Sequence, residues 1–378
     1  MKKKKPYEIG GEIRSWSVYV PREAGREVNK ILKSKWLNTG KQETKLRQAF
    51  SKKFHTPYCA ATSSGTASLR ASLAALGVGP GDEVVSTPYT FIATNTSILE
   101  QGAKPVFADI NYDTLNIDPK SIKKKITPKT KAIMCVHYGG NACDMDTIRK
   151  IGREYNLPII EDSAHALGSK YKGRYIGETG DIITFSFQVV KIITSGDGGM
   201  IATPKKNYYE KIKKYVWYGI DRDRKKKSII DPLPEKIDIL GFKYNMNDIT
   251  ATMALAGLKH IEQPLAQRRK IGRLYRRELD NLSKIRLLHY PKENTPNYQI
   301  FPVHVKNRMA FAKFMRNRGI FVVINNRRND RYSIFGRKQN LPSLKKADED
   351  TILLPVHSDL TDRDVEKIID AVKKYDKT

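Results

Sequence analysis

The sequence predicts an α/β fold, with a mostly parallel central sheet in a large domain and a smaller C-terminal α/β domain. The first two thirds of the chain alternate short apolar runs with amphipathic segments, which is typical of strands connected by crossover helices. Several apolar runs lack polar alternation, as expected for strands that helices cover on both faces. The length of 378 residues suits a large domain plus a smaller one.

Three helices are predicted near the N-terminus. Apolar residues recur at helical spacing over 24–32, and again over 46–54 at intervals of four residues, so each set lies on one helical face. A third helix is predicted over 67–76, where leucines recur on one side and Gly77 provides a stop.

Short apolar runs then predict six strands. They cover residues 83–86, 105–110, 131–137, 157–162, 182–187 and 200–203. Helical patterns lie between many of them, for example over 145–155. In open parallel sheets, ligands bind outside the carboxyl ends of the strands. The residues that end or follow the strands at 157–162 and 182–187 are therefore candidates for a site.

The last third of the chain predicts the smaller domain. We expect a large domain over residues 1–250 and a small domain over 251–378, with a helical pattern over 248–258 at the change. A final helix is predicted after Thr361, because Asp364 stands three residues further on, in the position of a capping box.

The net charge of +29 is unusual and predicts attraction to polyanions. Three explanations remain open: a nucleic acid partner, a diphosphate-bearing substrate with a phosphorylated cofactor, or solvated basic faces. The basic residues are spread along the chain rather than gathered in one block. No nucleic-acid-binding motif is visible, so a nucleic acid partner is the weakest of the three.

The chain has three cysteines, Cys59, Cys135 and Cys143, and no pair has CxxC spacing. A disulfide framework and a structural zinc site are therefore not expected, and a reducing, cytoplasmic compartment fits best. No apolar run reaches the about 18 residues that a membrane-spanning helix needs. The sequence also lacks GxGxxG, GxxxxGK[ST], HExxH and GxSxG, and we expect no metal.

Two residues at strand ends predict pyridoxal phosphate (PLP) chemistry. Asp162 ends one apolar run, and Lys191 follows Phe-Ser-Phe at the end of another. A PLP enzyme needs an amine that forms a Schiff base and a carboxylate that keeps the pyridine nitrogen protonated. Burial would lower the pKa of the lysine and favour the neutral amine that attacks an aldehyde. We therefore expect Lys191 to be catalytic and to carry the cofactor.

Other residues could bind the same cofactor. Ser64, Gly65 and Thr66 stand before a predicted helix, where backbone N–H groups favour an anion such as a phosphate. Ser186 could reach the same phosphate or bond to neighbouring backbone. Phe91 could stack on the pyridine ring or pack in the core.

The motifs resemble those of the DegT/DnrJ/EryC1/StrS aminotransferases, which are PLP enzymes acting on nucleotide-linked keto sugars. The resemblance runs in order along nearly the whole chain. It includes residues 36–40, 63–67, 79–83, 161–166, 185–191, 196–199, 217–221, 241–248 and 354–357.

The resemblance implies a type I PLP aminotransferase fold in a homodimer with active sites at the subunit interface. It implies that glutamate converts PLP to the pyridoxamine form, which then aminates a keto sugar nucleotide at C4 or, as the second choice, at C3. The product would serve a surface glycan, such as a lipopolysaccharide O-antigen, or a glycosylated metabolite.

The resemblance also implies residue roles. Lys191 would be Schiff base and proton shuttle, Asp162 would bind the ring nitrogen, and His165 would lie near the ring hydroxyl. Ser186, with the residues at 64–66, would bind the phosphate. A further set is assigned to the sugar substrate: Thr39, Gln188, Tyr218 and Arg328.

This chain departs from the family pattern at two places. Lys243 stands where the family often has an asparagine that reaches the partner's cofactor phosphate, and lysine could serve there by charge. The segment 325–332 is rich in arginine where many members have a histidine, and its arginines could pair with a diphosphate or be solvated.

Two alternatives within PLP chemistry stay open: a sugar dehydratase and an aminotransfer to a non-sugar ketone such as a cyclitol. Lys191 argues against the first, because dehydratases of this family carry histidine at that position.

Overall fold

The computed structural model describes residues 12–222, 237–324 and 327–378. Its centre is a seven-stranded sheet in the order β1-β9-β8-β5-β4-β2-β3. The strands are β1 (Tyr58–Thr62), β2 (Glu83–Ser86), β3 (Lys104–Phe107), β4 (Thr130–Val136), β5 (Ile159–Asp162), β8 (Ile182–Ser186) and β9 (Gly199–Thr203). Only β9 runs against its neighbours, and the other pairings are parallel. The prediction of a mostly parallel α/β sheet is therefore confirmed.

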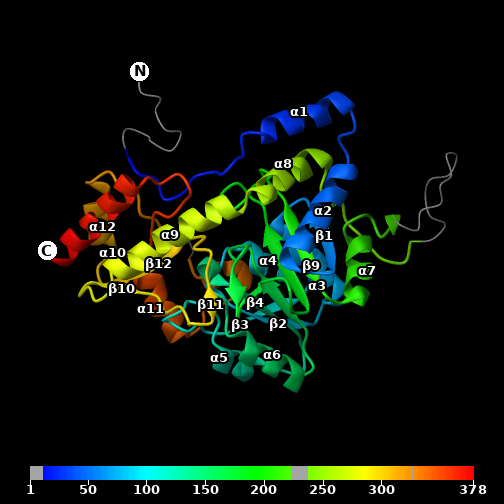
Figure 1. Ribbon diagram of the computed structural model, residues 1–378. Coiled ribbons are helices and arrows are strands. Elements are labelled where there is room, and N and C mark those ends of the chain that lie inside the picture. The colour runs from blue at the N-terminus through cyan, green and yellow to red at the C-terminus, as the bar shows by residue number, and fades with distance from the viewer. Residues whose placement is uncertain (1–11, 223–236, 325–326) are drawn as a thin grey trace.

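Eight helices of the described chain accompany this sheet, and the first of them packs outside the others, against the last (Figure 1). They are α1 (Ala24–Ser34), α2 (Lys41–Phe54), α3 (Gly65–Ala75), α4 (Ala93–Leu99), α5 (Pro119–Lys125), α6 (Met145–Glu154), α7 (Lys206–Tyr215) and α8 (Asp248–Lys259). The helices predicted over 24–32, 46–54, 67–76, 145–155 and 248–258 are all present. Sequence analysis missed β1, whose Tyr-Cys-Ala-Ala-Thr sequence offers few large apolar residues.

Alternate residues of each central strand face different helices. On β5, Ile159 packs with α5 and α6, whereas Ile160 packs with α3 and α4. On β8, Ile183 packs with α2 and α8, whereas Ile182 packs with α3 and α7. Helices thus cover both faces of the sheet, which explains the apolar runs without polar alternation.

A second, antiparallel sheet has the order β10-β12-β13. Its strands are β10 (Ile285–Leu287), β12 (Phe301–Val305) and β13 (Thr351–Leu354), and its neighbours include α9 (Glu262–Glu278), α10 (Arg308–Arg316), α11 (Pro342–Asp350) and α12 (Asp362–Asp376). The predicted capping box is present: the Thr361 hydroxyl accepts from the Asp364 N–H, and the Asp364 carboxylate accepts from the Thr361 N–H.

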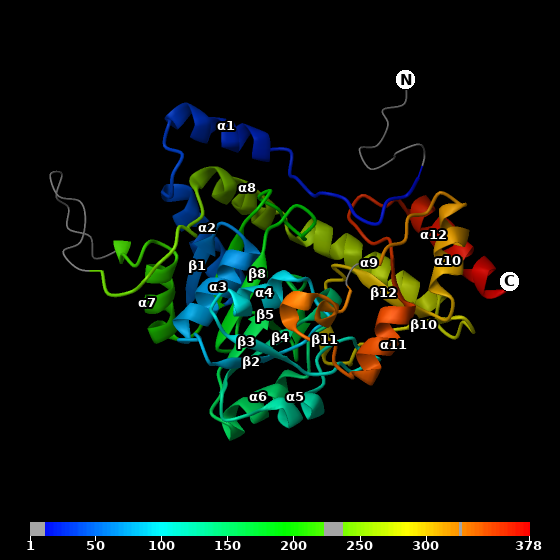
Figure 2. The same ribbon diagram turned by 180° about the vertical axis from the view of Figure 1, so that it is seen from behind.

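The chain passes from one hydrophobic core to the other inside α9. Leu265 belongs to the core of the central sheet, as do the apolar residues of α8, whereas Ile271 and Tyr275 belong to the core of the second sheet. Ile13 also packs in the second core and forms a bridge with Ile320. The change between cores thus lies in a continuous helix, seen next to α8 in Figures 1 and 2, and the domain boundary at residue 250 stays a prediction.

A short sheet of β11 (Asn294–Thr295), β6 (Lys170–Tyr171) and β7 (Arg174–Tyr175) further joins the two parts, because β11 pairs with β6. Within the described residues, no helix has both the length and the apolar composition required to cross a membrane.

Candidate active site

Asp162 and Ser186 stand at the carboxyl ends of β5 and β8, and their side chains lie on the same face of the sheet. Asp162 follows the alternation of Ile160, and Ser186 that of Ile182, so both lie on the face of the sheet that α3 covers. Lys191 lies in the loop after β8, where its N–H donates to the Gln188 carbonyl at 2.9 Å. The structure therefore gathers the main predicted residues at the edge where ligands of parallel sheets bind.

Asp162 is a buried carboxyl group with two hydrogen bonds. Its Oδ2 accepts from the Thr94 hydroxyl at 2.8 Å, and its Oδ1 accepts from the Ala164 N–H at 3.1 Å. Burial raises the pKa of Asp162, whereas these two hydrogen bonds and the charge of Lys191 act in the opposite direction. The aspartate thus has the partners that an ionised carboxylate requires.

The Lys191 side chain is partly withdrawn from water. Burial lowers its pKa to about 8, although attraction to Asp162 partly opposes this shift. A lysine with this pKa has a substantial neutral fraction near neutral pH, which is the form that attacks a carbonyl carbon. The roles assigned to Asp162 and Lys191 stay predictions.

His165 is held neutral beside Lys191. Burial lowers the pKa of the imidazole well below its usual value, and the positive charge of Lys191 lowers it further. The ring lies edge-on to Tyr138 at 6.0 Å between centroids. The buried Nδ1 of His165 has no hydrogen-bond partner among the described residues, so it is free to bond to a bound group.

Gly65 and Ser186 form a close cradle at the start of α3. A Cβ atom at Gly65 would lie only 2.9 Å from the Ser186 Cβ, so only glycine leaves this space open. Ser64 caps α3 by accepting from the Ala67 N–H at 3.0 Å, and the N–H groups of Gly65 and Thr66 begin the first turn. A helix N-terminus with nearby hydroxyl groups suits an anion such as a phosphate.

Phe91 precedes α4 and is 65% exposed. This exposure excludes the alternative in which Phe91 packs in the core. Gln188 lies at the cradle, because its N–H donates to the Ser186 hydroxyl at 3.2 Å, and its Oε1 accepts from the Val190 N–H.

Behind Asp162, Glu161 faces the opposite side of β5. Its carboxylate bonds to His137 Nε2 at 3.0 Å and to Arg149 Nη2 at 3.2 Å. His137 Nδ1 accepts from the Cys143 N–H at 3.1 Å, so this nitrogen carries no proton and the imidazole is neutral. These contacts hold β5 on the face opposite Asp162. The sequence analysis did not predict them.

Thr39, Tyr218 and Lys243 belong to another region of the same chain. Thr39 donates to the Met246 carbonyl at 2.7 Å and accepts from Asn245. Lys243 donates to Asn245 Oδ1 at 2.9 Å, and its ammonium lies 3.8 Å from the Trp217 ring centroid. Thr39 and Lys243 thus both contact Asn245, which forms a bridge with Thr62 at the end of β1.

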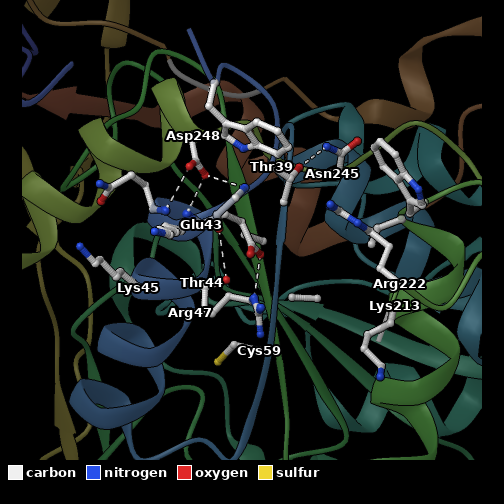
Figure 3. A pocket seen from close by; sticks show the side chains of 18 of the residues that line it. Thr39, Glu43, Thr44, Lys45, Arg47, Cys59, Lys213, Arg222, Asn245 and Asp248 are labelled. Carbon is white, nitrogen blue, oxygen red and sulfur yellow. Dashed lines mark hydrogen bonds and ion pairs between the residues drawn. The ribbon is translucent and has the colours of Figure 1, made fainter. Parts of the chain in front are cut away.

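Thr39 and Asn245 line a cavity of about 1070 Å³ beside the edge strand β1 (Figure 3). In this view the Asp248 carboxylate points at the start of α2, where it accepts from the N–H groups of Gly40 and Glu43. Neither Lys191 nor Asp162 is among the described residues that line this cavity.

Arg328 is buried, unlike the solvated or diphosphate-binding arginine that the sequence suggested. Its guanidinium makes two bonds to the Asp330 carboxylate, at 2.7 and 2.6 Å, and one to the Gln339 carbonyl at 2.8 Å. This arginine therefore serves the fold of its own segment, and its assignment to the substrate stays a prediction. Residues 325–326 of the segment lie outside the described residues.

Four residues at this site were not predicted: Thr90, Thr94, Asn95 and Asn329. Thr94 contacts Asp162, and the other three hold the loop before α4 in place. The spacing of Thr90 and Thr94, four residues apart, was a signal that could have indicated one helical side. No local pattern could have indicated Asn329, because it lies 234 residues from Asn95.

Comparisons with known proteins agree with this geometry. The chain is 37% identical over 363 residues to the uncharacterised protein MJ1066 of Methanocaldococcus jannaschii, covering 92% of this chain and 94% of that one. The aminotransferase TlmJ of Streptoalloteichus hindustanus superposes with a TM-score of 0.90 at 29% identity, covering 96% and 98% of the two chains. The sugar aminotransferase CalS13 of Micromonospora echinospora gives a TM-score of 0.91 at 26% identity, covering 96% and 99%.

The type I PLP aminotransferase fold predicted from the sequence is therefore confirmed, and the chain is an enzyme of the transaminase type. Residues 20–373 match one family over most of the chain. This chain belongs to the DegT/DnrJ/EryC1/StrS aminotransferase family.

Proposed function

We propose that the protein is a PLP-dependent aminotransferase that moves an amino group from glutamate to a nucleotide-linked keto sugar. A 4-keto-6-deoxyhexose is the first choice of acceptor, giving the 4-amino sugar for a surface glycan or another glycosylated product. The observation that carries the proposal is geometric: Asp162 ends β5, and Lys191 follows the neighbouring parallel strand β8 at the same edge of the sheet. The family and the similarity to a sugar aminotransferase support the class of substrate.

The residues of the site fit PLP. The start of α3, where Gly65 packs closely against Ser186, offers first-turn N–H groups and hydroxyl groups to a phosphate. Asp162 supplies the carboxylate for the ring nitrogen, and Lys191 supplies the amine. The unpaired Nδ1 of His165 provides a further polar contact. Phe91, exposed just before α4, is free to cover the ring.

When bound, PLP supplies an electron-withdrawing ring that stabilises the charge left after a proton is removed from carbon. The residues of this chain supply the rest. Lys191 holds the cofactor, and its amine, with a pKa of about 8, takes up and returns protons near neutral pH. An ionised Asp162 would hold the ring nitrogen and keep it protonated.

We further propose that the active form is a homodimer with active sites at the subunit interface. Exposed apolar side chains support this arrangement: Trp36 is 61% exposed, and Leu37 and Tyr218 are also exposed. The cavity of Figure 3 beside the edge strand β1 leaves further surface for a second copy. In the dimer, Lys243 and Tyr218 would serve the site of the other subunit.

We expect the enzyme to act in the cytoplasm. Its three cysteines, Cys59, Cys135 and Cys143, are buried free thiols, which suits a reducing compartment.

The proposal is tested by the visible absorbance of the purified protein with added PLP, before and after excess glutamate. We expect an absorbance band of the covalently bound cofactor that glutamate converts to the pyridoxamine spectrum. A panel of nucleotide-linked 3-keto and 4-keto deoxysugars should then restore the original band with the correct acceptor. Lys191→Ala should lose the band, whereas Lys172→Ala, which changes an exposed lysine, should keep it. Full transamination by Lys191→Ala would contradict the assignment.

A further inference from the structure

A chain of buried hydroxyl groups ends at Asp162. The Thr94 hydroxyl lies 2.8 Å from Asp162 Oδ2 and 2.9 Å from the Thr90 hydroxyl, and both threonines are almost fully buried. A hydroxyl has one proton. If Thr94 donates to Asp162, Thr90 must donate to Thr94. Each hydroxyl group in this series thus donates toward Asp162, which favours the ionised carboxylate.

A residue from the C-terminal part of the chain holds these threonines in place. The Asn329 side chain donates to the Thr90 carbonyl at 3.0 Å and accepts from Asn95 Nδ2 at 2.8 Å. Its backbone N–H donates to the Pro88 carbonyl at 2.8 Å. Asn95 in turn donates to the Thr87 carbonyl at 2.9 Å. One buried asparagine thus contacts Pro88 and Thr90 in the loop and Asn95 in α4, the helix that carries Thr94.

Asn329 is itself fixed by its two neighbours. Arg328 and Asp330 form the two-bonded ion pair described above, and both side chains are almost fully buried. Asp330 also accepts from the Gln339 N–H at 2.9 Å. A buried two-bonded pair of this kind has a narrow geometry, so it places Asn329 accurately against the loop before α4.

We propose that Thr94 and Asn329 are positioning residues for Asp162, which keep its carboxylate ionised and aimed at the cofactor ring nitrogen. The C-terminal segment 327–330 thereby acts on the protonation of the cofactor, although it lies on a different part of the chain from Asp162 and Lys191. This inference rests on the proposed function for its catalytic meaning, because the ring nitrogen belongs to PLP.

The two residues matter energetically because one proton can lie on either of two groups. In the bound state, Asp162 and the ring nitrogen share a proton, and its place depends on which group binds it more strongly. Removal of a hydrogen bond to a charged group shifts such an equilibrium by about tenfold or more. Loss of the Thr94 hydroxyl should therefore move the proton from the ring nitrogen toward Asp162.

The variants separate positioning from folding. Thr94→Val keeps the shape of the side chain and removes the hydroxyl, and Thr94→Ser restores it. Asn329→Ala removes the anchor of the loop. Ser97→Ala is the matched control, because the Ser97 hydroxyl is buried on the same helix but donates to the Thr94 carbonyl and not to Asp162.

The first measurement uses the protein without cofactor. With aspartate labelled at the side-chain carbon, NMR titration gives the pKa of Asp162, and Asp162→Asn identifies its signal. We expect Thr94→Val to raise this pKa by about one unit, Asn329→Ala to raise it as well, and Thr94→Ser and Ser97→Ala to leave it near the wild-type value. An unchanged pKa in folded Thr94→Val would overturn the proposal, and an unchanged pKa in folded Asn329→Ala would overturn the part played by Asn329.

The second measurement uses PLP labelled with ¹⁵N in the ring. The ¹⁵N shift of the bound cofactor should move toward the unprotonated value in Thr94→Val and Asn329→Ala, but not in the two controls. A wild-type shift in both variants would overturn the coupling to the ring. If the wild-type protein formed no covalent complex with PLP, the proposed function would fail, and the titration of Asp162 would still decide the role of Thr94.

Discussion

Replacement of Gly65 with alanine should close the anion cradle while leaving the fold intact. The added Cβ would lie 2.9 Å from the Ser186 Cβ and 3.1 Å from its Oγ, closer than ordinary contacts between such atoms. The Ser186 Cβ is attached directly to β8 and cannot rotate away, so α3 or the strand end must shift by a few tenths of an ångström or more.

Overpacking of this kind costs about 1–3 kcal/mol. If about 1.4–2.8 kcal/mol of it opposes phosphate binding, the Kd for PLP rises about 10-fold to 100-fold. Titration of the cofactor-free protein with PLP, followed by absorbance, measures the Kd, and thermal unfolding checks the fold. Gly79→Ala is the control, because nothing lies within 4 Å of a Cβ at Gly79. A wild-type Kd in Gly65→Ala would refute the assignment of the cradle.

Four further predictions concern charge and assembly. Because the pKa of Lys191 is about 8, the initial rate of covalent PLP loading should rise with pH and level off above about pH 8; a rate independent of pH from 6 to 9 would contradict this. In the unfolded chain, Lys191 has the ordinary lysine pKa of 10.5, so the unfolded state binds more protons than the folded state between pH 8 and 10.5. The free energy of unfolding of the cofactor-free protein should therefore rise with pH in that window. Urea unfolding at several pH values would show this. Arg328→Met should lower the free energy of unfolding by about 3–5 kcal/mol, because it leaves the buried Asp330 carboxylate without its partner cation. Arg327→Met, at an exposed position, should have little effect. An equal loss in both variants would argue against the buried pair. Trp36→Asp should convert the proposed dimer to a monomer in light scattering, and an unchanged mass would remove Trp36 from the interface.

The sequence predicted the central sheet well where the strands are apolar on both faces. The runs over 131–137 and 157–162 contain consecutive apolar residues, and they became β4 and β5 with boundaries shifted by one or two residues. By contrast, β1 has small side chains and gives little signal, and its place at the edge of the sheet depends on pairing with β9. Such pairing between distant segments cannot be read from local periodicity.

The candidate site was predicted only in part, for a similar reason. Asp162 and Lys191 end or follow apolar runs, so their chemistry was visible in the sequence. Thr94 and Asn329 act through contacts between segments far apart in the chain, which no spacing rule describes. Arg328 could not be assigned from the sequence, because its burial depends on the matching carboxylate of Asp330 and the distant carbonyl of Gln339.

The continuous helix α9 has a consequence for how the protein unfolds. Arg268, buried in α9, donates to the carbonyl groups of Tyr298, Gln299 and Val356, and the next residue, Arg269, donates to the Gly168 carbonyl. A single turn of this helix therefore binds backbone from both parts of the chain. Neither core can lose its order without breaking contacts of the other, so calorimetry should find a single cooperative transition, and a fragment beginning at residue 251 should not fold alone.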